Sequence, residues 1–154
     1  MGMGLNESLT PAKGTYLLQM RARKPSRIKV GKLGDLHIIP GHYVYVGSAF
    51  GPGGLKARLA HHLKITQRPH WHIDYLRKVV EVECVYFNAS GERLEDQWAQ
   101  KLFTLPGAEI PLMGFGASDS QSASHLFFFA ERPELSCFDA KKRVIKSIFA
   151  SHPP

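Results

Sequence analysis

The sequence predicts an α/β (α+β) fold, with a small and mainly antiparallel central sheet that is flanked by helices. Three observations predict it. Short strand-like segments are interspersed with helical segments along the chain. The chain has 154 residues, 44% of them hydrophobic, which suits one domain with one core. No internal repeat is visible. We therefore expect a loose polar leader at residues 1–13 and a single domain at residues 14–150.

Strands dominate the first part of the domain. Residues 14–20 form one strand candidate, and residues 42–46 form another after the Pro40-Gly41 turn. Between them, residues 27–31 and 36–39 predict two short strands around a turn at Gly34-Asp35. We expect this hairpin to lengthen the connection between the two flanking strands.

A helix signal follows the second of these strands. The Gly51-Pro52-Gly53-Gly54 turn predicts the start of a helix of about 10 residues. Its apolar stripe comprises Leu55, Leu59 and Leu63. Residues 70–78 predict a short second helix, and residues 79–87 predict an apolar strand.

The rest of the chain predicts two more helices and one strand. Ser90-Gly91 is expected to cap a helix at residues 92–105, and the apolar stripe of that helix comprises Leu94, Trp98 and Leu102. A loop rich in Gly, Ser and Pro follows, and residues 125–130 predict a buried strand. Residues 139–150 predict an amphipathic helix, whose core face comprises Val144, Ile145, Ile148 and Phe149.

The chain is basic, with 20 Lys and Arg against 13 Asp and Glu and a net charge of +7. This balance favours a polyanionic partner, because each phosphate that is neutralised releases a condensed counterion; a merely soluble basic protein is the alternative. The basic run that begins at Arg21 is either a solvated hairpin edge or an edge that follows a phosphate backbone. The candidate nucleic-acid contacts are Lys24, Arg27, Lys29, Lys32, Gly53, Gly54, Lys56 and His61.

Cysteine usage and hydropathy indicate the compartment. Cys84 and Cys137 lie far apart and have no partners at metal-ligand spacing, so a disulfide scaffold or zinc finger is not expected. No apolar run approaches the roughly 20 residues needed to span a bilayer. Residues 1–5 are too short and too poor in charge for a signal peptide. We expect a cytoplasmic protein that does not associate with membranes.

Two short aromatic-glycine motifs suggest a catalytic site, Gly14-Thr15-Tyr16 and Tyr45-Val46-Gly47. The helix after the second motif carries Arg58 and His62 four residues apart, on one flank. Unpaired amides at its glycine-rich start would attract an anion, and a guanidinium can bind two phosphate oxygens at once. These groups together are suited to gripping and cutting a phosphodiester. The alternative is that Arg58 is an ordinary surface arginine.

The predicted third helix carries three acids. On a helix, Glu92 and Asp96 project away from the apolar stripe, whereas Glu95 falls on it. A carboxylate on an apolar face is costly unless it is paired or bound to a cation. Glu95 is therefore either a metal ligand facing a cleft or half of a buried salt bridge, with Arg58 as a candidate partner.

The His70-Trp71-His72 segment invites a metal interpretation. Side chains at i and i+2 diverge on a helix, so we do not expect both histidines on one ion. A structural segment is favoured, in which Trp71 and Tyr75 pack in the core and His70 can pair with Asp74. One histidine could still line the cleft.

These features resemble the GIY-YIG nuclease superfamily. Its members place two tyrosines on neighbouring antiparallel strands, an arginine on the following helix and a metal-binding glutamate on a later helix. The matching residues here are Tyr16, Tyr45, Arg58 and Glu95, and His62 stands where several members also carry a histidine. The chain looks most like a small stand-alone branch that is also found fused to DNA-repair domains. The segments that carry this similarity are residues 45–49, 51–55, 70–76 and 124–127.

The resemblance implies a divalent-metal-dependent DNA endonuclease acting in DNA repair or processing. Glu95 is expected to hold Mg²⁺ (or Mn²⁺), and Arg58 is expected to brace the pentavalent phosphate. Tyr45, with Tyr16 and His62, is expected to deprotonate or position the attacking water. A phenol has a pKa of about 10, so a nearby cation would have to lower it.

The implied partner is DNA, structured or damaged, with RNA as an alternative. A catalytically silent nucleic-acid-binding module of the same fold is the alternative function.

The chain departs from the superfamily pattern in three places. Thr15 replaces an isoleucine, which leaves the glycine and tyrosine of the motif in place. The inserted hairpin between the motifs prevents the substrate from being carried over from other members. Ser120 and Ser122 stand where the branch often has cysteines, so a metal or redox role resting on those cysteines is not expected.

Overall fold

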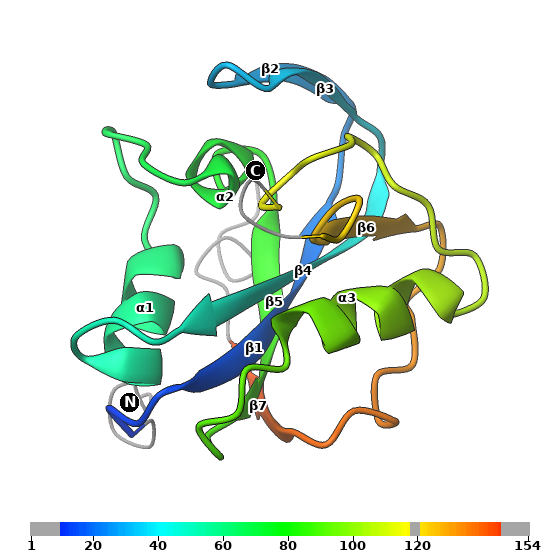
Figure 1. The fold of residues 1–154 in the computed structure, drawn as a ribbon. Coiled ribbons are helices and arrows are strands. Elements are labelled where there is room, and N and C mark those ends of the chain that lie inside the picture. Colours follow the sequence, from blue (N-terminus) through cyan, green and yellow to red (C-terminus); the bar gives the residue numbers. More distant parts are fainter. Residues whose placement is uncertain (1–9, 118–120, 146–154) are drawn as a thin grey trace.

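A five-stranded antiparallel sheet forms the centre of the molecule (Figure 1). The computed structural model describes residues 10–117 and 121–145. The strand order is β6-β4-β1-β5-β7. The strands are β1 (Gly14–Ala22), β4 (Gly41–Ala49), β5 (Glu81–Asn88), β6 (Leu126–Phe129) and β7 (Lys141–Val144). The predicted fold class, an α/β (α+β) protein with a mainly antiparallel central sheet, is confirmed.

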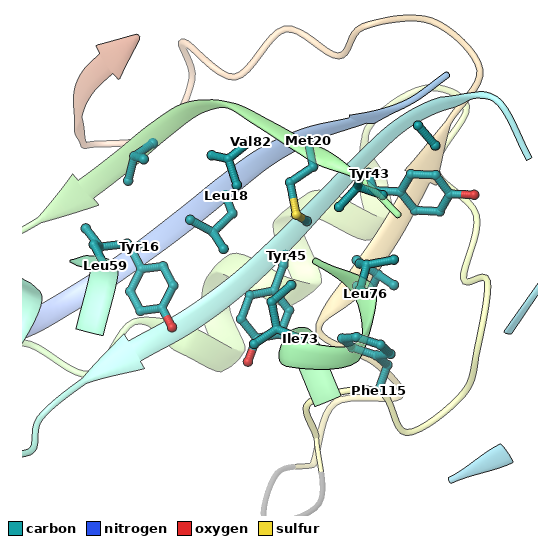
Figure 2. Close-up of a cluster of buried hydrophobic side chains, with 14 of the residues drawn as sticks. Tyr16, Leu18, Met20, Tyr43, Tyr45, Leu59, Ile73, Leu76, Val82 and Phe115 are labelled. Carbon is teal, nitrogen blue, oxygen red and sulfur yellow. The ribbon is translucent and has the colours of Figure 1, made fainter. Parts of the chain in front are cut away.

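Strand β1 is central and is covered on both faces. Its alternate residues separate into two hydrophobic clusters: Tyr16, Leu18 and Met20 belong to one, and Leu17 belongs to the other. Strand β4 follows the same alternation, with Tyr45 in the first cluster and Val44 and Val46 in the second. Figure 2 shows the first cluster, in which the rings of Tyr16 and Tyr45 project from neighbouring strands toward the same face.

Helices α1 (Gly54–His62) and α2 (His72–Leu76) contribute to the first cluster, and helix α3 (Glu95–Thr104) contributes to the second. Leu55 and Leu59 of the predicted stripe are fully buried, which explains why α1 lies against the sheet. In α3 the buried positions are Trp98, Ala99 and Leu102. The N-cap of α3 is Leu94 rather than Ser90-Gly91, so the predicted cap was wrong. None of the helices in the described ranges has the length and apolar character needed to cross a membrane.

The predicted hairpin is confirmed as a separate two-stranded sheet, formed by β2 (Ser26–Val30) and β3 (Gly34–Ile38). Its turn lies at residues 31–33, because Gly34 and Asp35 pair with Val30 and Lys29 inside the ladder. The placement of the turn at Gly34-Asp35 was therefore wrong. Gly31 supplies the left-handed conformation that the turn needs, with φ 50°.

The predicted C-terminal helix at residues 139–150 is wrong where the structure describes it. Residues 141–144 form strand β7, which pairs with Cys84–Phe87 of β5. This pairing satisfies backbone groups along an edge of β5, and Ile145 extends it by donating to the Glu83 carbonyl at 2.9 Å. Val144, assigned to the core face, is 67% exposed. Residues 146–150, with Ile148 and Phe149, lie outside the described residues.

Candidate active site

Tyr16 and His62 form the buried centre of the site. The Tyr16 hydroxyl lies 2.6 Å from His62 Nε2, within hydrogen-bonding distance. The Tyr45 ring lies beside both, with centroids 6.4 Å from Tyr16 and 6.2 Å from His62. His62 is held in place by Arg77, whose buried guanidinium donates to the His62 carbonyl at the end of α1, at 2.7 Å. The two motif tyrosines and the predicted helix histidine therefore meet at one point.

The glycines of the two motifs are explained by close approaches. Gly47 pairs with Tyr16 across the sheet, and a Cβ at Gly47 would overlap the Tyr16 hydroxyl. A Cβ at Gly14 would overlap the carbonyl oxygen of Asn88 on β5. The glycine of the second motif thus makes room for the tyrosine of the first motif.

Arg58 of α1 lies beside the end of β4, where two contacts orient its side chain. Its Nη1 donates to the Ser48 carbonyl at 2.8 Å. Its guanidinium lies over the Trp71 ring, 4.4 Å from the centroid. Within residues 10–117 and 121–145 it forms no ion pair with a carboxylate, so the alternative of a salt bridge with Glu95 is not observed. The guanidinium charge is therefore available to an anionic ligand.

Glu95 is the first residue of α3 and, like Arg58, contacts Ser48. Its Oε1 accepts a hydrogen bond from Ser48 Oγ at 3.3 Å, and its Oε2 lies 3.2 Å from His125 Nδ1. The Glu95 side chain is 29% exposed, so the carboxylate is half-buried rather than sealed in the core. Ser48 therefore links the two candidate site residues, since its carbonyl contacts Arg58 and its hydroxyl contacts Glu95.

His125 was not among the predicted site residues. It is buried and bridges two carboxylates, because its Nε2 lies 3.3 Å from Asp96 Oδ1. Burial alone would lower the His125 pKa, but the hydrogen bonds and negative charges of Glu95 and Asp96 raise it above its ordinary value. The sequence prediction placed residues 124–127 among the segments expected to resemble the GIY-YIG branch, but it assigned His125 no role. Ser48 likewise lay inside a similar segment.

Burial controls the protonation of the site. It raises the pKa of Tyr16, helped by the neighbouring Tyr45, and it raises the pKa of Tyr45, helped by Glu95. Arg58 opposes both shifts but does not outweigh them. A phenol that acts as the base would need a pKa lowered by a nearby cation, and Arg58 alone does not achieve this. Burial, with the charges of Arg58 and His61, lowers the pKa of His62 to about 3, so this imidazole is neutral at physiological pH.

The amides at the start of α1 are already paired. The Gly54, Leu55 and Lys56 N–H groups donate to the carbonyls of Gly51, Ala12 and Thr10 at 3.1, 2.9 and 3.2 Å. The Gly54 amide, an expected phosphate contact, thus donates to Gly51 within the turn, while Ala12 and Thr10, at the end of the assigned leader, accept the next two amides. A Cβ at Gly54 would overlap the Pro11 and Ala12 carbonyl oxygens, which explains that glycine.

A shallow hollow of about 270 Å³ lies outside this helix start. It is lined by the glycine-rich turn together with Arg58, His61 and Trp71, and it gives a ligand access to the guanidinium. A larger hollow of about 740 Å³, at the end of β5 and the start of β7, is lined by none of the predicted site residues.

The predicted nucleic-acid contacts fall into two groups on either side of α2 (Figure 1). The hairpin group is exposed and comprises Lys24, Arg27, Lys29 and Lys32. Lys29 lies opposite Asp35 in the hairpin, so part of this positive charge is offset. The second group is the start of α1, with Gly53, Gly54, Lys56 and His61. Of these, Lys56 and Gly53 are exposed, whereas Gly54 is buried.

Asp74 organises the segment between α1 and α2. Its Oδ2 accepts the backbone N–H groups of His70 and Trp71 at 2.8 and 3.0 Å, and its Oδ1 contacts His61 Nε2 at 3.0 Å. The expected pair with His70 thus runs through the His70 backbone. Burial opposes ionisation of Asp74, but these hydrogen bonds outweigh it and lower its pKa. Trp71 and Tyr75 pack against the core, as predicted.

Comparison with known protein families gives a match to most of the chain. The model of the family described as "Domain of unknown function DUF123" matches residues 15–147. The chain belongs to the DUF123 family. No curated protein and no solved structure matches it significantly. The matched range includes Tyr16, Tyr45, Arg58, His62 and Glu95, so the whole candidate site lies inside the DUF123 domain.

Proposed function

We propose that this DUF123 domain is a divalent-metal-dependent DNA endonuclease of the GIY-YIG type. The observation that carries the proposal is the arrangement around Ser48. Arg58 and Glu95 contact the same serine from two elements, and Tyr16, Tyr45 and His62 cluster beside Arg58. Among the described residues Arg58 has no carboxylate partner, so its charge is left for an anionic ligand.

Glu95 is the residue that would hold Mg²⁺ (or Mn²⁺). Mg²⁺ is commonly bound by one or two carboxylates and completes its shell with water and substrate phosphate oxygens, so a single carboxylate suffices. The Glu95 side chain is 29% exposed, which leaves room for such a shell. Ser48 and His125 fix the orientation of the carboxylate. When bound, the ion supplies charge stabilisation for the leaving oxygen.

The other side chains bind and orient the substrate. Arg58 offers a planar guanidinium to the phosphate, and its contacts with Ser48 and Trp71 restrict its motion before substrate arrives. Because both phenols retain their protons, Tyr45 and Tyr16 act as hydrogen-bonding groups that position water or phosphate. Neutral His62 holds the Tyr16 hydroxyl at 2.6 Å.

DNA is the proposed substrate because the chain carries a net charge of +7 and an exposed basic hairpin beside α2. A catalytically silent DNA- or RNA-binding module is the second candidate. The raised pKa of both tyrosines favours it, because neither phenol is a ready base at neutral pH.

The test is cleavage of supercoiled plasmid and of branched or flapped DNA with Mg²⁺ or Mn²⁺, against an EDTA control. We expect nicking by the wild type and by Glu92→Gln, since Glu92 is exposed. We expect no nicking by Glu95→Gln. Metal-independent cutting, or equal cutting by Glu95→Gln, would contradict the proposed site. Binding of the same DNA without any cutting would favour the silent module.

A further inference from the structure

We propose that His61, His62 and Asp74 bind one borderline transition-metal ion of the Zn²⁺ class where α1 meets α2. One ligand atom from each of these residues lies within 4.8 Å of the other two. Two imidazoles and a carboxylate form a ligand set that suits Zn²⁺ and its neighbours in the first transition row.

His62 provides the second, independent observation. It is only 1% exposed. Its Nε2 is engaged by the Tyr16 hydroxyl at 2.6 Å. Its Nδ1 is buried and has no hydrogen-bond partner within the described ranges 10–117 and 121–145. A buried polar atom without a partner is uncommon in a native fold, and a metal ion bound at this nitrogen would account for it.

Asp74 is held by backbone N–H groups, and His61 is open to solvent. The Asp74 carboxylate is 2% exposed, and two backbone N–H groups hold its Oδ2, so its Oδ1 points consistently at His61 Nε2, 3.0 Å away. The His61 side chain is 36% exposed, so an ion could enter from that side and complete its shell with water. Outer contacts of this kind orient the ligands in known metal centres.

The site is distinct from the proposed magnesium position. Mg²⁺ prefers oxygen ligands, whereas two of the three ligands here are nitrogens. Glu95 is not among the ligands, so the inference does not depend on nuclease activity. A bound ion would join α1 to α2 and fix the orientation of His62 beside Tyr16, because coordination at Nδ1 leaves Nε2 for the Tyr16 hydroxyl.

The test is a titration of metal-free protein with Co²⁺, followed by its visible absorption, and with Zn²⁺ by calorimetry. We expect one equivalent to bind wild type, Zn²⁺ to displace Co²⁺, and excess Mg²⁺ not to displace it. His61→Asn should weaken Zn²⁺ binding by at least about 100-fold. It should still fold, because His61 is partly exposed and asparagine can donate to Asp74. His70→Asn is the matched control, since His70 is exposed and its contact with Asp74 is through the backbone.

Glu95→Gln separates this inference from the proposed function. It should retain full Zn²⁺ binding even where cleavage is lost. Equal Zn²⁺ affinity in wild type and His61→Asn would overturn the assignment, as would a failure of metal-free wild type to take up Co²⁺ or Zn²⁺. Loss of Zn²⁺ binding in His70→Asn would place the ligands elsewhere.

Discussion

Replacing Gly47 with alanine tests whether the two motifs depend on each other. A Cβ at Gly47 would lie 2.5 Å from Tyr16 Cζ and 3.0 Å from Cε1, far inside van der Waals contact. Tyr16 is 0% exposed and lies on the central strand, so its ring has no open space into which to move. Gly47→Ala must therefore displace either the ring or strand β4.

The magnitude follows from two effects. Overpacking of a well-packed core costs about 1–3 kcal/mol. Displacing the Tyr16 hydroxyl from His62 Nε2, which lies 2.6 Å away, leaves buried polar groups without partners and costs about 1–3 kcal/mol more. We expect Gly47→Ala to lower the free energy of unfolding by roughly 2–6 kcal/mol, out of the 5–15 kcal/mol typical of a domain.

The assay is urea denaturation followed by circular dichroism. Gly51→Ala is the matched control, because no atom lies within 4 Å of a Cβ built at Gly51, and it should change stability by less than about 0.5 kcal/mol. Equal stability of Gly47→Ala and Gly51→Ala would refute the account of why the second motif ends in glycine.

Further predictions concern Trp71, His62 and the basic hairpin. Trp71→Leu removes the ring beneath Arg58. A cation–π contact is worth about 0.5–1 kcal/mol, so we expect kcat/KM for cleavage to fall about two- to five-fold. An unchanged kcat/KM would argue against the positioning of Arg58 by Trp71. The His62 pKa of about 3 predicts that its NMR resonances stay constant from pH 8 to pH 5, and a midpoint near 6.5 would contradict the structure. His62 takes up a proton at about pH 6.5 in the unfolded chain but not in the folded protein, so the free energy of unfolding falls as the pH drops below that value. His62→Asn should remove this contribution to the loss of stability in acid. The double substitution Arg27→Ala with Lys29→Ala should reduce the slope of log Kd against log salt concentration for DNA by about 1–2, since each removes one phosphate contact; an unchanged slope would place the DNA away from the hairpin.

Much of the fold followed from local patterns. Strand β1, the hairpin and the leucine face of α1 were predicted because each carries its periodicity within a few consecutive residues. The residues that meet at the site were also predicted: Tyr16 and Tyr45 by their motifs, and His62 by its place on the helix.

The errors concern partners that are distant in the sequence. Residues 139–150 have a helical pattern, but β5 has an edge with which residues 141–144 pair, and no local pattern reports that edge. At the start of α1, the carbonyls of Ala12 and Thr10 accept the Leu55 and Lys56 amides, and no local pattern reports these distant partners. Ser48 and His125 belong to the site because they contact the Glu95 carboxylate. Both residues are distant from Glu95 in the sequence, so these contacts appear only in the assembled sheet.

The central claim is that Glu95 serves cleavage rather than DNA recognition. The most direct measurement compares Glu95→Gln with wild type in two assays on one labelled DNA, one for Kd and one for metal-dependent cleavage. The account predicts a Kd within about twofold of wild type and no detectable cleavage, because the substitution removes the carboxylate charge proposed to hold the metal and leaves the basic surface intact. Wild-type cleavage rates in Glu95→Gln, or a parallel loss of binding and cleavage, would contradict it.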